Sequence, residues 1–250
     1  MPEENRKTVI VTGGTRGIGA AISRRAAAAG YAVCMTYSRN HDAAAELVAT
    51  LRADGASCFA IAGRQEDPAF AEAVFAAATE QLGAVTALVN NAGVTGPIGS
   101  FAASAADTFR TVLDVNLLGP MLMSQQAIRR WQADGTPGTI VNISSIAATL
   151  GAPNEYVAYA ASKAGLEALT IGLAKEVAIS GIRVNAVAPG TVYTDIHAAA
   201  GEPDRPARVV SRVPMGRIGL PEEIANAAMW LLSQEASYVT GAVLRVSGGL

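Results

Sequence analysis

The 250-residue sequence predicts one α/β domain built on a doubly wound parallel sheet with helices on both faces. Short runs of β-branched and apolar residues alternate along the chain with longer segments in which apolar residues recur at three- and four-residue spacing. Half of the residues are hydrophobic, which is enough for a large core, and no linker or fixed-period repeat divides the chain. Strands alternating with helices imply right-handed crossovers and a parallel sheet.

Seven strands are expected, with a helix between each strand and the next. In such sheets ligands bind at the carboxyl ends of the strands, near the point where the strand order reverses. The expected strands are 8–12, 31–37, 57–62, 86–90, 139–144, 183–188 and 242–246, and the expected helices are 16–29, 43–53, 68–82, 107–132, 156–180 and 221–232.

The first strand is a run of five β-branched residues, and it is followed by glycines and an alanine-rich helical pattern. Gly13, Gly17 and Gly19 follow the spacing G-x-x-x-G-x-G. Glycines permit a tight turn and close backbone approach, and a helix N-terminus offers N–H groups and a positive dipole to a pyrophosphate. A purely structural turn is the alternative, but the strand before and the helix after favour phosphate binding.

The end of the second strand bears on the choice of dinucleotide. A site that prefers NAD usually has an acidic residue here to bind the ribose 2′-hydroxyl, but the first acid, Asp42, comes later and is expected to cap the next helix. Arg39 with Ser38, aided by Arg16 in the glycine turn, suits a 2′-phosphate. We therefore expect NADP(H) to be preferred over NAD(H). A solvated loop charge is the alternative for Arg39.

The fourth strand ends in the sequence Asn90-Asn-Ala-Gly93, where the chain must turn sharply. In the long helix that follows, Asn116 interrupts an apolar pattern, and Pro120 has no N–H to donate to the Asn116 carbonyl. That carbonyl would be available for a water that connects Lys163 with solvent. An incidental helix kink explains the same residues equally well.

The fifth strand ends near Ser144 and Ser145, at the same edge of the sheet. A hydroxyl at that edge could bind a substrate carbonyl oxygen and polarise it. Neighbouring strand residues face opposite ways, so only one of the two serines points inward, and we expect it to be Ser145.

The helix 156–180 carries Tyr159 and, four residues later, Lys163. Residues four apart share a helix face, so the two side chains can converge, and a neighbouring cation favours the phenolate of a tyrosine. Tyr159 could then exchange a proton with a substrate hydroxyl. Such a pair is also common on an ordinary amphipathic helix and needs support from elsewhere. Tyr156 lies two turns from Lys163 and is expected to line a substrate pocket.

The segment 191–219 follows the sixth strand and contains three prolines with mixed polarity. It is longer than a simple connection, and we expect a mobile substrate lid. His197 lies in it and is not assigned a catalytic role, because a lone histidine is more often a surface or packing residue.

Together these motifs resemble the classical short-chain dehydrogenases/reductases over essentially the whole chain. The order and spacing match for the glycine turn, Asn90-Asn-Ala-Gly93, Asn116, Ser145 and Tyr159-x-x-x-Lys163. The resemblance implies a Rossmann-like seven-stranded sheet. It also implies a catalytic tetrad of Asn116, Ser145, Tyr159 and Lys163, in which Tyr159 is the proton donor in reduction and Lys163 holds the cofactor ribose and lowers the pKa of Tyr159.

The resemblance implies that a nicotinamide cofactor is held by residues from several strand ends. These are Gly13, Thr15, Arg16, Gly17, Ile18, Gly19, Ser38, Arg39, Asn90, Ala92, Gly93, Tyr159, Lys163, Pro189, Gly190, Val192 and Thr194. The chain departs from the family in two places. Gly63-Arg64-Gln65 replaces a frequent Asp that contacts adenine, and Ser247-Gly-Gly replaces a common Asp-Gly-Gly.

Composition limits the partners. The formal net charge is −2 with scattered basic residues, which argues against nucleic-acid binding. The first seven residues are polar and no later segment has transmembrane length, so we expect a cytoplasmic protein without a membrane partner. Cys34 and Cys58 lack metal-ligand spacing, and no metal is expected. The resemblance implies a homotetramer.

The leading hypothesis is an NADP(H)-dependent oxidoreductase that interconverts a carbonyl and a secondary alcohol on a small-molecule substrate. An NAD(P)-dependent sugar dehydrogenase and a dinucleotide-binding protein without turnover are the alternatives. Apolar Val157, Ile196 and Met215 suggest only that hydrophobic ketones are tolerated.

Overall fold

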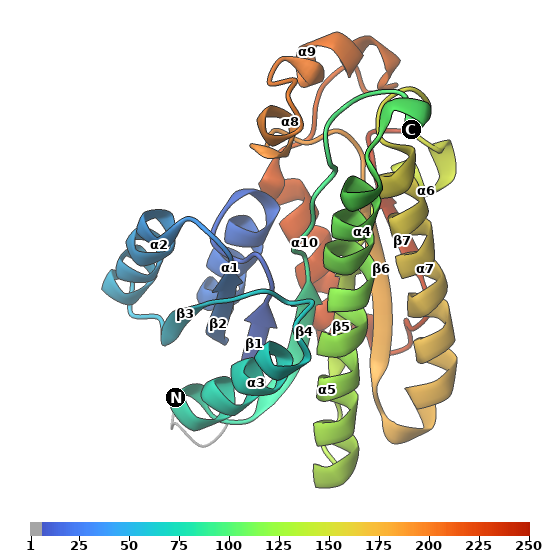
Figure 1. The fold of residues 1–250 in the computed structure, drawn as a ribbon. Coiled ribbons are helices and arrows are strands. Elements are labelled where there is room, and N and C mark those ends of the chain that lie inside the picture. The colour runs from blue at the N-terminus through green and yellow to red at the C-terminus, as the bar shows by residue number, and fades with distance from the viewer. Residues whose placement is uncertain (1–6) are drawn as a thin grey trace.

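Seven parallel strands form one sheet in the order β3-β2-β1-β4-β5-β6-β7 (Figure 1). The computed structural model describes residues 7–250, so the expectation about the first residues lies almost entirely outside the described part. The strands are β1 Thr8–Val11, β2 Ala32–Tyr37, β3 Cys58–Ala62, β4 Val85–Asn90, β5 Thr139–Ile143, β6 Arg183–Pro189 and β7 Val243–Val246. The expected doubly wound, Rossmann-like fold is confirmed.

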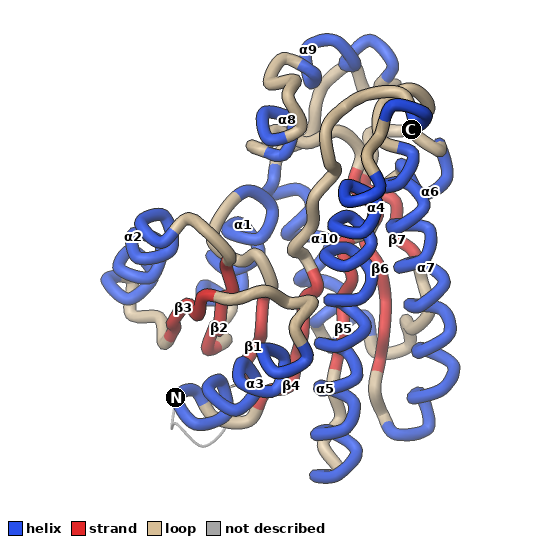
Figure 2. The backbone as a smooth tube through the Cα atoms, in the orientation of Figure 1, coloured by secondary structure: helices blue, strands red, loops and turns tan. Residues whose placement is uncertain are grey.

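Helices cover both faces of the sheet (Figures 1 and 2). Alternate strand residues point to opposite faces, so Val9 and Val11 belong to one core and Ile10 to the other. The first core also contains residues of α1 Gly17–Ala28, α2 His41–Ala53 and α10 Pro221–Leu232. The second contains residues of α3 Pro68–Leu82, α5 Gly119–Asp134 and α7 Val157–Val177.

The strand order reverses between β1 and β4, which pair with each other. Their carboxyl ends are tied by Asn91, whose side-chain amide donates to the carbonyls of Thr12 and Gly13. The Thr12 hydroxyl accepts bonds from the backbone N–H groups of Asn91 and Ala92. The switch point therefore joins the glycine turn to the loop after β4.

The start of α2 differs from the expectation. The helix begins at His41, and its cap is Asn40, whose side chain accepts a bond from the Ala43 N–H at 3.0 Å. Asp42 lies in the first turn and does not cap the helix. An amide oxygen satisfies the free N–H as well as a carboxylate does, and both residue types are favoured at this position.

The single helix expected over 107–132 is divided. It consists of α4 Ala106–Leu113, a π-helical turn at Asp114–Leu118 and α5. In this turn the Gly119 N–H bonds to the Asp114 carbonyl, five residues back. The same spacing sets Pro120 opposite the Val115 carbonyl, and proline has no N–H to donate. The wider turn carries Asn116, and π-helical turns of this kind occur often at functional sites.

The 191–219 segment, which is the expected lid, contains two short helices between its first and last residues. They are α8 Ile196–Ala199 and α9 Arg205–Val209. The ends of the segment are joined: the Tyr193 N–H donates to the Gly219 carbonyl and the Gly219 N–H to the Thr191 carbonyl, both at 3.0 Å. A further short helix, α6 Ala147–Leu150, follows β5. Within residues 7–250 no helix is both long and apolar enough to cross a bilayer.

Candidate active site

Tyr159 and Lys163 lie on one face of α7 and are both buried, with exposed fractions of 9% and 3%. The Lys163 ammonium lies 5.7 Å from the centre of the Tyr159 ring. It donates a hydrogen bond of 2.7 Å to the carbonyl of Ile143, the last residue of β5. Burial lowers the pKa of Lys163 to about 8. The convergence expected from the four-residue spacing is therefore present in the fold.

The two serines after β5 point to different partners. The Ser144 side chain is buried and donates to the Glu167 carboxylate at 2.8 Å. The Ser145 hydroxyl accepts a bond from the Ala147 N–H and pairs with the Tyr159 phenol. The structure thus brings Ser145, and not Ser144, to the Tyr159 phenol.

The acidity of Tyr159 corrects one expectation. Burial raises its pKa above the ordinary value, while the hydrogen bond from Ser145 and the charge of Arg205 act in the opposite direction. Desolvation of the phenol therefore outweighs the lowering that was expected from the nearby Lys163 cation. The phenol is therefore neutral at neutral pH, which is the form that can donate a proton.

Asn116 is fully buried in the π-helical turn, and its side chain makes three hydrogen bonds. It exchanges two bonds of 2.8 Å with the backbone of Val94, and it donates to the Ser162 hydroxyl at 3.0 Å. A Cβ added at Gly93 would lie 3.3 Å from the Asn116 amide oxygen and 3.5 Å from the Lys163 ammonium. Asn116, Lys163 and the loop after β4 therefore meet.

Gln65 is a residue of this region that sequence reasoning left without a role. It is 5% exposed, and its amide N–H₂ donates to the Val115 carbonyl at 2.6 Å and the Ala92 carbonyl at 3.3 Å. The Val115 carbonyl is the one that faces Pro120 in the π-helical turn. A Cβ at Gly119 would lie 2.5 Å from Gln65 Cγ, so the glutamine fits only beside glycine. In the sequence, the pair Gly119-Pro120 after Asn116 is the feature that could have indicated this contact.

The glycine turn has the geometry of a phosphate cradle. Gly13 and Gly17 have φ of +59° and +50°, a conformation that favours glycine. A Cβ at Gly19 would lie 2.1 Å from the Gly13 carbonyl oxygen, which excludes any side chain there. Helix α1 has no acidic residue in its first turn and no side-chain cap from Arg16. Its N-terminal N–H groups thus suit an anionic group.

The ends of β1 and β2 lie side by side at the glycine turn. The Gly14 N–H donates to the Thr36 carbonyl, and the Gly13 N–H donates to the Thr36 hydroxyl. Arg16 and Arg39 are both exposed, and within residues 7–250 neither side chain is in an ion pair. Ser38 is exposed beside Arg39.

The remaining expected cofactor residues have different settings. Thr194 contacts the glycine turn, since a Cβ at Gly17 would lie 3.2 Å from its Cγ2. Gly190, after Pro189, packs on the backbone of Ser247, at 2.8 Å from an added Cβ, and Val192 is buried. Thr15 is buried and Ile18 half-buried in the glycine turn.

Asn90 is not placed as a side-chain ligand of a cofactor. Its amide N–H₂ donates to the Ser124 hydroxyl and the Asn142 amide oxygen, both inside the protein. The Asn142 amide in turn donates to Thr170 on α7. This buried chain of polar side chains links β4, β5 and two helices, so the Asn90 side chain helps to hold these elements together.

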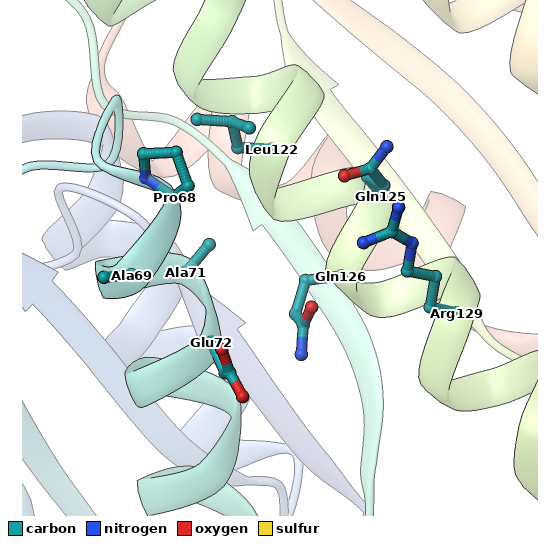
Figure 3. Close-up of a pocket in the computed structure, with 8 residues that line it drawn as sticks. All are labelled: Pro68, Ala69, Ala71, Glu72, Leu122, Gln125, Gln126 and Arg129. Atoms are coloured by element: carbon teal, nitrogen blue, oxygen red, sulfur yellow. The ribbon is translucent and has the colours of Figure 1, made fainter.

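Two further features lie outside this cluster. The His197 ring bonds to the Val192 carbonyl at 3.1 Å, in keeping with a packing role. A groove of about 220 Å³ runs between α3 and α5 and is lined by Glu72, Gln125 and Arg129 among others (Figure 3). None of the expected site residues lines this groove.

Known proteins that are similar in sequence show which family the chain belongs to. A family model described as enoyl-(acyl carrier protein) reductase matches residues 13–250. The chain is 43% identical over 242 residues to the uncharacterized oxidoreductase YgfF of Escherichia coli, covering 96% of this chain and 98% of that protein. It is 40% identical over 245 residues to 3beta-hydroxysteroid dehydrogenase 1 of Eggerthella lenta, covering 98% and 93%.

A solved structure agrees with these matches in fold. It is the crystal structure of a blue fluorescent protein from a metagenomic library in complex with NADPH, with a TM-score of 0.88 and 35% identity over 98% of both chains. Family model, relatives and fold cover nearly the same residues, including the glycine turn and the Tyr159 helix. The chain therefore belongs to the short-chain dehydrogenase/reductase family of oxidoreductases.

Proposed function

We propose that this protein is an NADP(H)-dependent oxidoreductase that interconverts a carbonyl group and a secondary alcohol, with Tyr159 as the acid/base. The meeting of Ser145, Tyr159 and Lys163 beside Asn116, at the carboxyl ends of β4 and β5, supports the proposal most strongly. A protein that only bound a dinucleotide would have no need of a buried phenol paired with a serine hydroxyl.

In the direction of reduction each residue has one task. The Ser145 hydroxyl holds the substrate oxygen, and the Tyr159 phenol, kept neutral by burial, gives that oxygen its proton. The Lys163 ammonium beside the phenol stabilises the phenolate that remains. We assign to the backbone carbonyl of Asn116, in the π-helical turn, a water that returns the proton from solvent. The bound cofactor supplies or accepts the hydride.

The glycine turn and the two exposed arginines fit a dinucleotide that carries a 2′-phosphate. Helix α1 begins at this turn with no acidic residue in its first turn, and Arg16 and Arg39 are exposed cations that precede α1 and follow β2. A guanidinium can bind phosphate with two parallel hydrogen bonds. The solved relative with bound NADPH is consistent with this choice.

We expect Arg39→Asp to reverse the cofactor preference. The carboxylate repels a 2′-phosphate and can accept a bond from the ribose hydroxyl of NAD(H). The ratio of kcat/KM for NADPH to that for NADH should fall by about one hundredfold, which corresponds to the loss of one charge-assisted contact and its replacement by repulsion. Initial rates with both cofactors measure this ratio, and Arg24→Asp on α1 is the control. An unchanged ratio contradicts the assignment of Arg39.

Turnover itself is tested by following the near-ultraviolet absorbance of reduced nicotinamide. NADPH and then NADH are offered with a panel of ketones, β-ketoesters and sugar lactones, and NADP⁺ and NAD⁺ with the corresponding alcohols and with glucose. Oxidation of NADPH by a carbonyl compound is the expected result. Turnover of sugars alone would favour a sugar dehydrogenase. No turnover with any combination of cofactor and substrate would favour a dinucleotide-binding protein without enzymatic activity.

A homotetramer is our proposal for the assembly. Large apolar side chains are exposed on the outer helices, at Leu113, Leu118 and Met121 around the π-helical turn and at Ile171 on α7. Tyr238, just before β7, is fully exposed. Exposed apolar patches of this kind commonly form interfaces. Sedimentation at micromolar concentration should give four times the 25.5 kDa chain mass, and a monomer would contradict the proposal.

A further inference from the structure

Arg205, on α9 of the 191–219 segment, is a cation held close to the candidate active site. Its side chain is only 12% exposed. It donates two hydrogen bonds, of 2.6 and 3.0 Å, to one oxygen of Glu155, which precedes α7 and is 13% exposed. A nearly buried pair joined in this way is costly to break, because either partner alone would leave a desolvated charge. The pair fixes α9 to the entrance of the Tyr159 helix.

The same carboxylate is held by a second arginine. Arg208 donates to the other oxygen of Glu155 at 2.8 Å and also pairs with Glu202. Burial by itself would raise the pKa of Glu155, but the bonds from Arg205 and Arg208 outweigh burial and lower it. Glu155 is therefore a carboxylate at neutral pH, and it is balanced by two cations.

The loop that carries Glu155 has an unusual backbone. Ala152 and Asn154 have φ of +46° and +60°, in the left-handed region that residues other than glycine adopt uncommonly, asparagine more readily than alanine. The Ala152 carbonyl accepts bonds from the N–H groups of Glu155 and Tyr156, and the Glu155 carbonyl accepts one from Gly99. Such conformations persist where the surroundings fix them, and these backbone bonds fix the loop that carries Glu155.

Arg205 also contacts the aromatic pair of the site. Its guanidinium lies 5.1 Å from the centre of the Tyr156 ring, a cation–π arrangement. The Tyr156 ring meets the Tyr159 ring edge to face, with centres 5.3 Å apart. A continuous line of contacts therefore runs from Glu155 through Arg205 and Tyr156 to Tyr159.

We propose that Arg205 is a positioning residue of this active site: when the 191–219 segment is docked on Glu155, Arg205 packs Tyr156 against Tyr159 and adds a positive charge that stabilises the Tyr159 phenolate. This inference rests on the proposed acid/base role of Tyr159. It assigns the segment a part in proton transfer as well as in covering the substrate.

The charges around Tyr159 determine the direction of the effect. Within residues 7–250, the titratable groups that face its phenol or ring are Lys163 from α7, Tyr156 just before α7 and Arg205 from α9. The neighbouring elements contribute apolar Val112, Ala147 and Val94. Arg205 favours the phenolate, and Glu155 offsets part of that positive charge. Removing the arginine and removing the carboxylate must therefore change the proton affinity of Tyr159 in opposite directions.

The test uses the pH dependence of alcohol oxidation at saturating NADP⁺, with the secondary alcohol that corresponds to the best carbonyl compound of the panel. In this direction kcat/KM rises with pH as Tyr159 loses its proton. Arg205→Met keeps an apolar chain over Tyr156 and removes the charge, and it should move the kinetic pKa upward by about half a unit or more. Glu155→Gln keeps an acceptor oxygen for Arg205, and it should move the kinetic pKa downward.

Matched variants exclude simpler explanations. Arg208→Met removes the more exposed arginine from the same carboxylate and should leave the kinetic pKa within about two tenths of a unit. Thermal unfolding of each variant separates a loss of folding from a change in acidity. If the Arg205–Glu155 pair only holds the segment in place, Arg205→Met and Glu155→Gln should shift the kinetic pKa in the same direction or not at all. Either result overturns the proposal.

Failure of the underlying function gives a different result. If Tyr159→Phe retains wild-type turnover, the acid/base role itself is wrong. If Tyr159→Phe is inactive but the two charge variants do not diverge, only the role of Arg205 is wrong.

Discussion

Replacing Tyr159 by phenylalanine should lower kcat/KM for carbonyl reduction by about a thousandfold while leaving the protein folded. The substitution removes only the phenolic oxygen, so the ring still packs against Tyr156 and the helix α7 is unaffected. What is lost is the group that gives a proton to the substrate oxygen, and general acid catalysis of this kind contributes about 10² to 10⁴ in rate. Initial rates with NADPH measure the loss.

The control for this prediction is Tyr156→Phe. Tyr156 belongs to the same aromatic pair, but we expect it to line the substrate pocket and not to transfer a proton. Its variant should change KM more than kcat. Equal losses of kcat in the two variants would mean that the aromatic pair acts as a whole, and full activity of Tyr159→Phe would contradict the mechanism. Fluorescence titration with NADPH checks that both variants still bind the cofactor.

Gln65→Glu should be strongly destabilising, although it replaces one atom. The amide N–H₂ of Gln65 supplies donors to the carbonyls of Val115 and Ala92, and a carboxylate would bring negative charge against both of them. Leaving buried acceptors unpaired and burying an unpaired charge together cost about 3–5 kcal/mol. Denaturant unfolding at pH 8 should show a free energy of unfolding lower by that amount.

The pH dependence of this loss has a definite sign. Burial and the facing carbonyls raise the folded-state pKa of a carboxyl at position 65 above its unfolded value of about 4.3. The loss relative to wild type is therefore smallest below that value, where the carboxylic acid can still donate one bond, and grows as pH rises through the folded-state pKa. Gln125→Glu, on the exposed side of α5, is the matched control and should change stability by less than about 0.5 kcal/mol (Figure 3). A pH-independent loss would contradict this account.

The sheet could be predicted from the sequence because its strands are short apolar runs whose burial is visible in composition alone. Seven strands were expected and residues 7–250 contain seven, with boundaries that differ by no more than one residue. The motif residues Tyr159, Ser145 and Lys163 could be named from their spacing because each follows a strand end or shares a helix face. The alternation of side chains along a strand indicated that only one of the two serines would face the tyrosine, but it did not show which one.

Other features depend on contacts that sequence patterns do not encode. The π-helical turn arises where Pro120 and the packing of Asn116 on Val94 act together, and a helical period alone cannot show it. Gln65 meets Val115 across 50 residues, and Arg205 meets Glu155 across the same separation. The pKa of Tyr159 was expected to fall on the strength of a nearby cation, but desolvation is a property of the folded core and it dominates.

The joined ends of the 191–219 segment have a consequence for how this enzyme can change. Thr191 and Gly219 already meet through backbone bonds at the edge of the sheet, so the segment leaves and returns at nearly one point. A loop closed at its base can be exchanged for one of another length at little entropic cost, about 0.6 kcal/mol for each doubling. The intervening residues can therefore be exchanged as a unit while the sheet and the Tyr159 helix stay as they are, and we propose that substrate choice can be altered in this way.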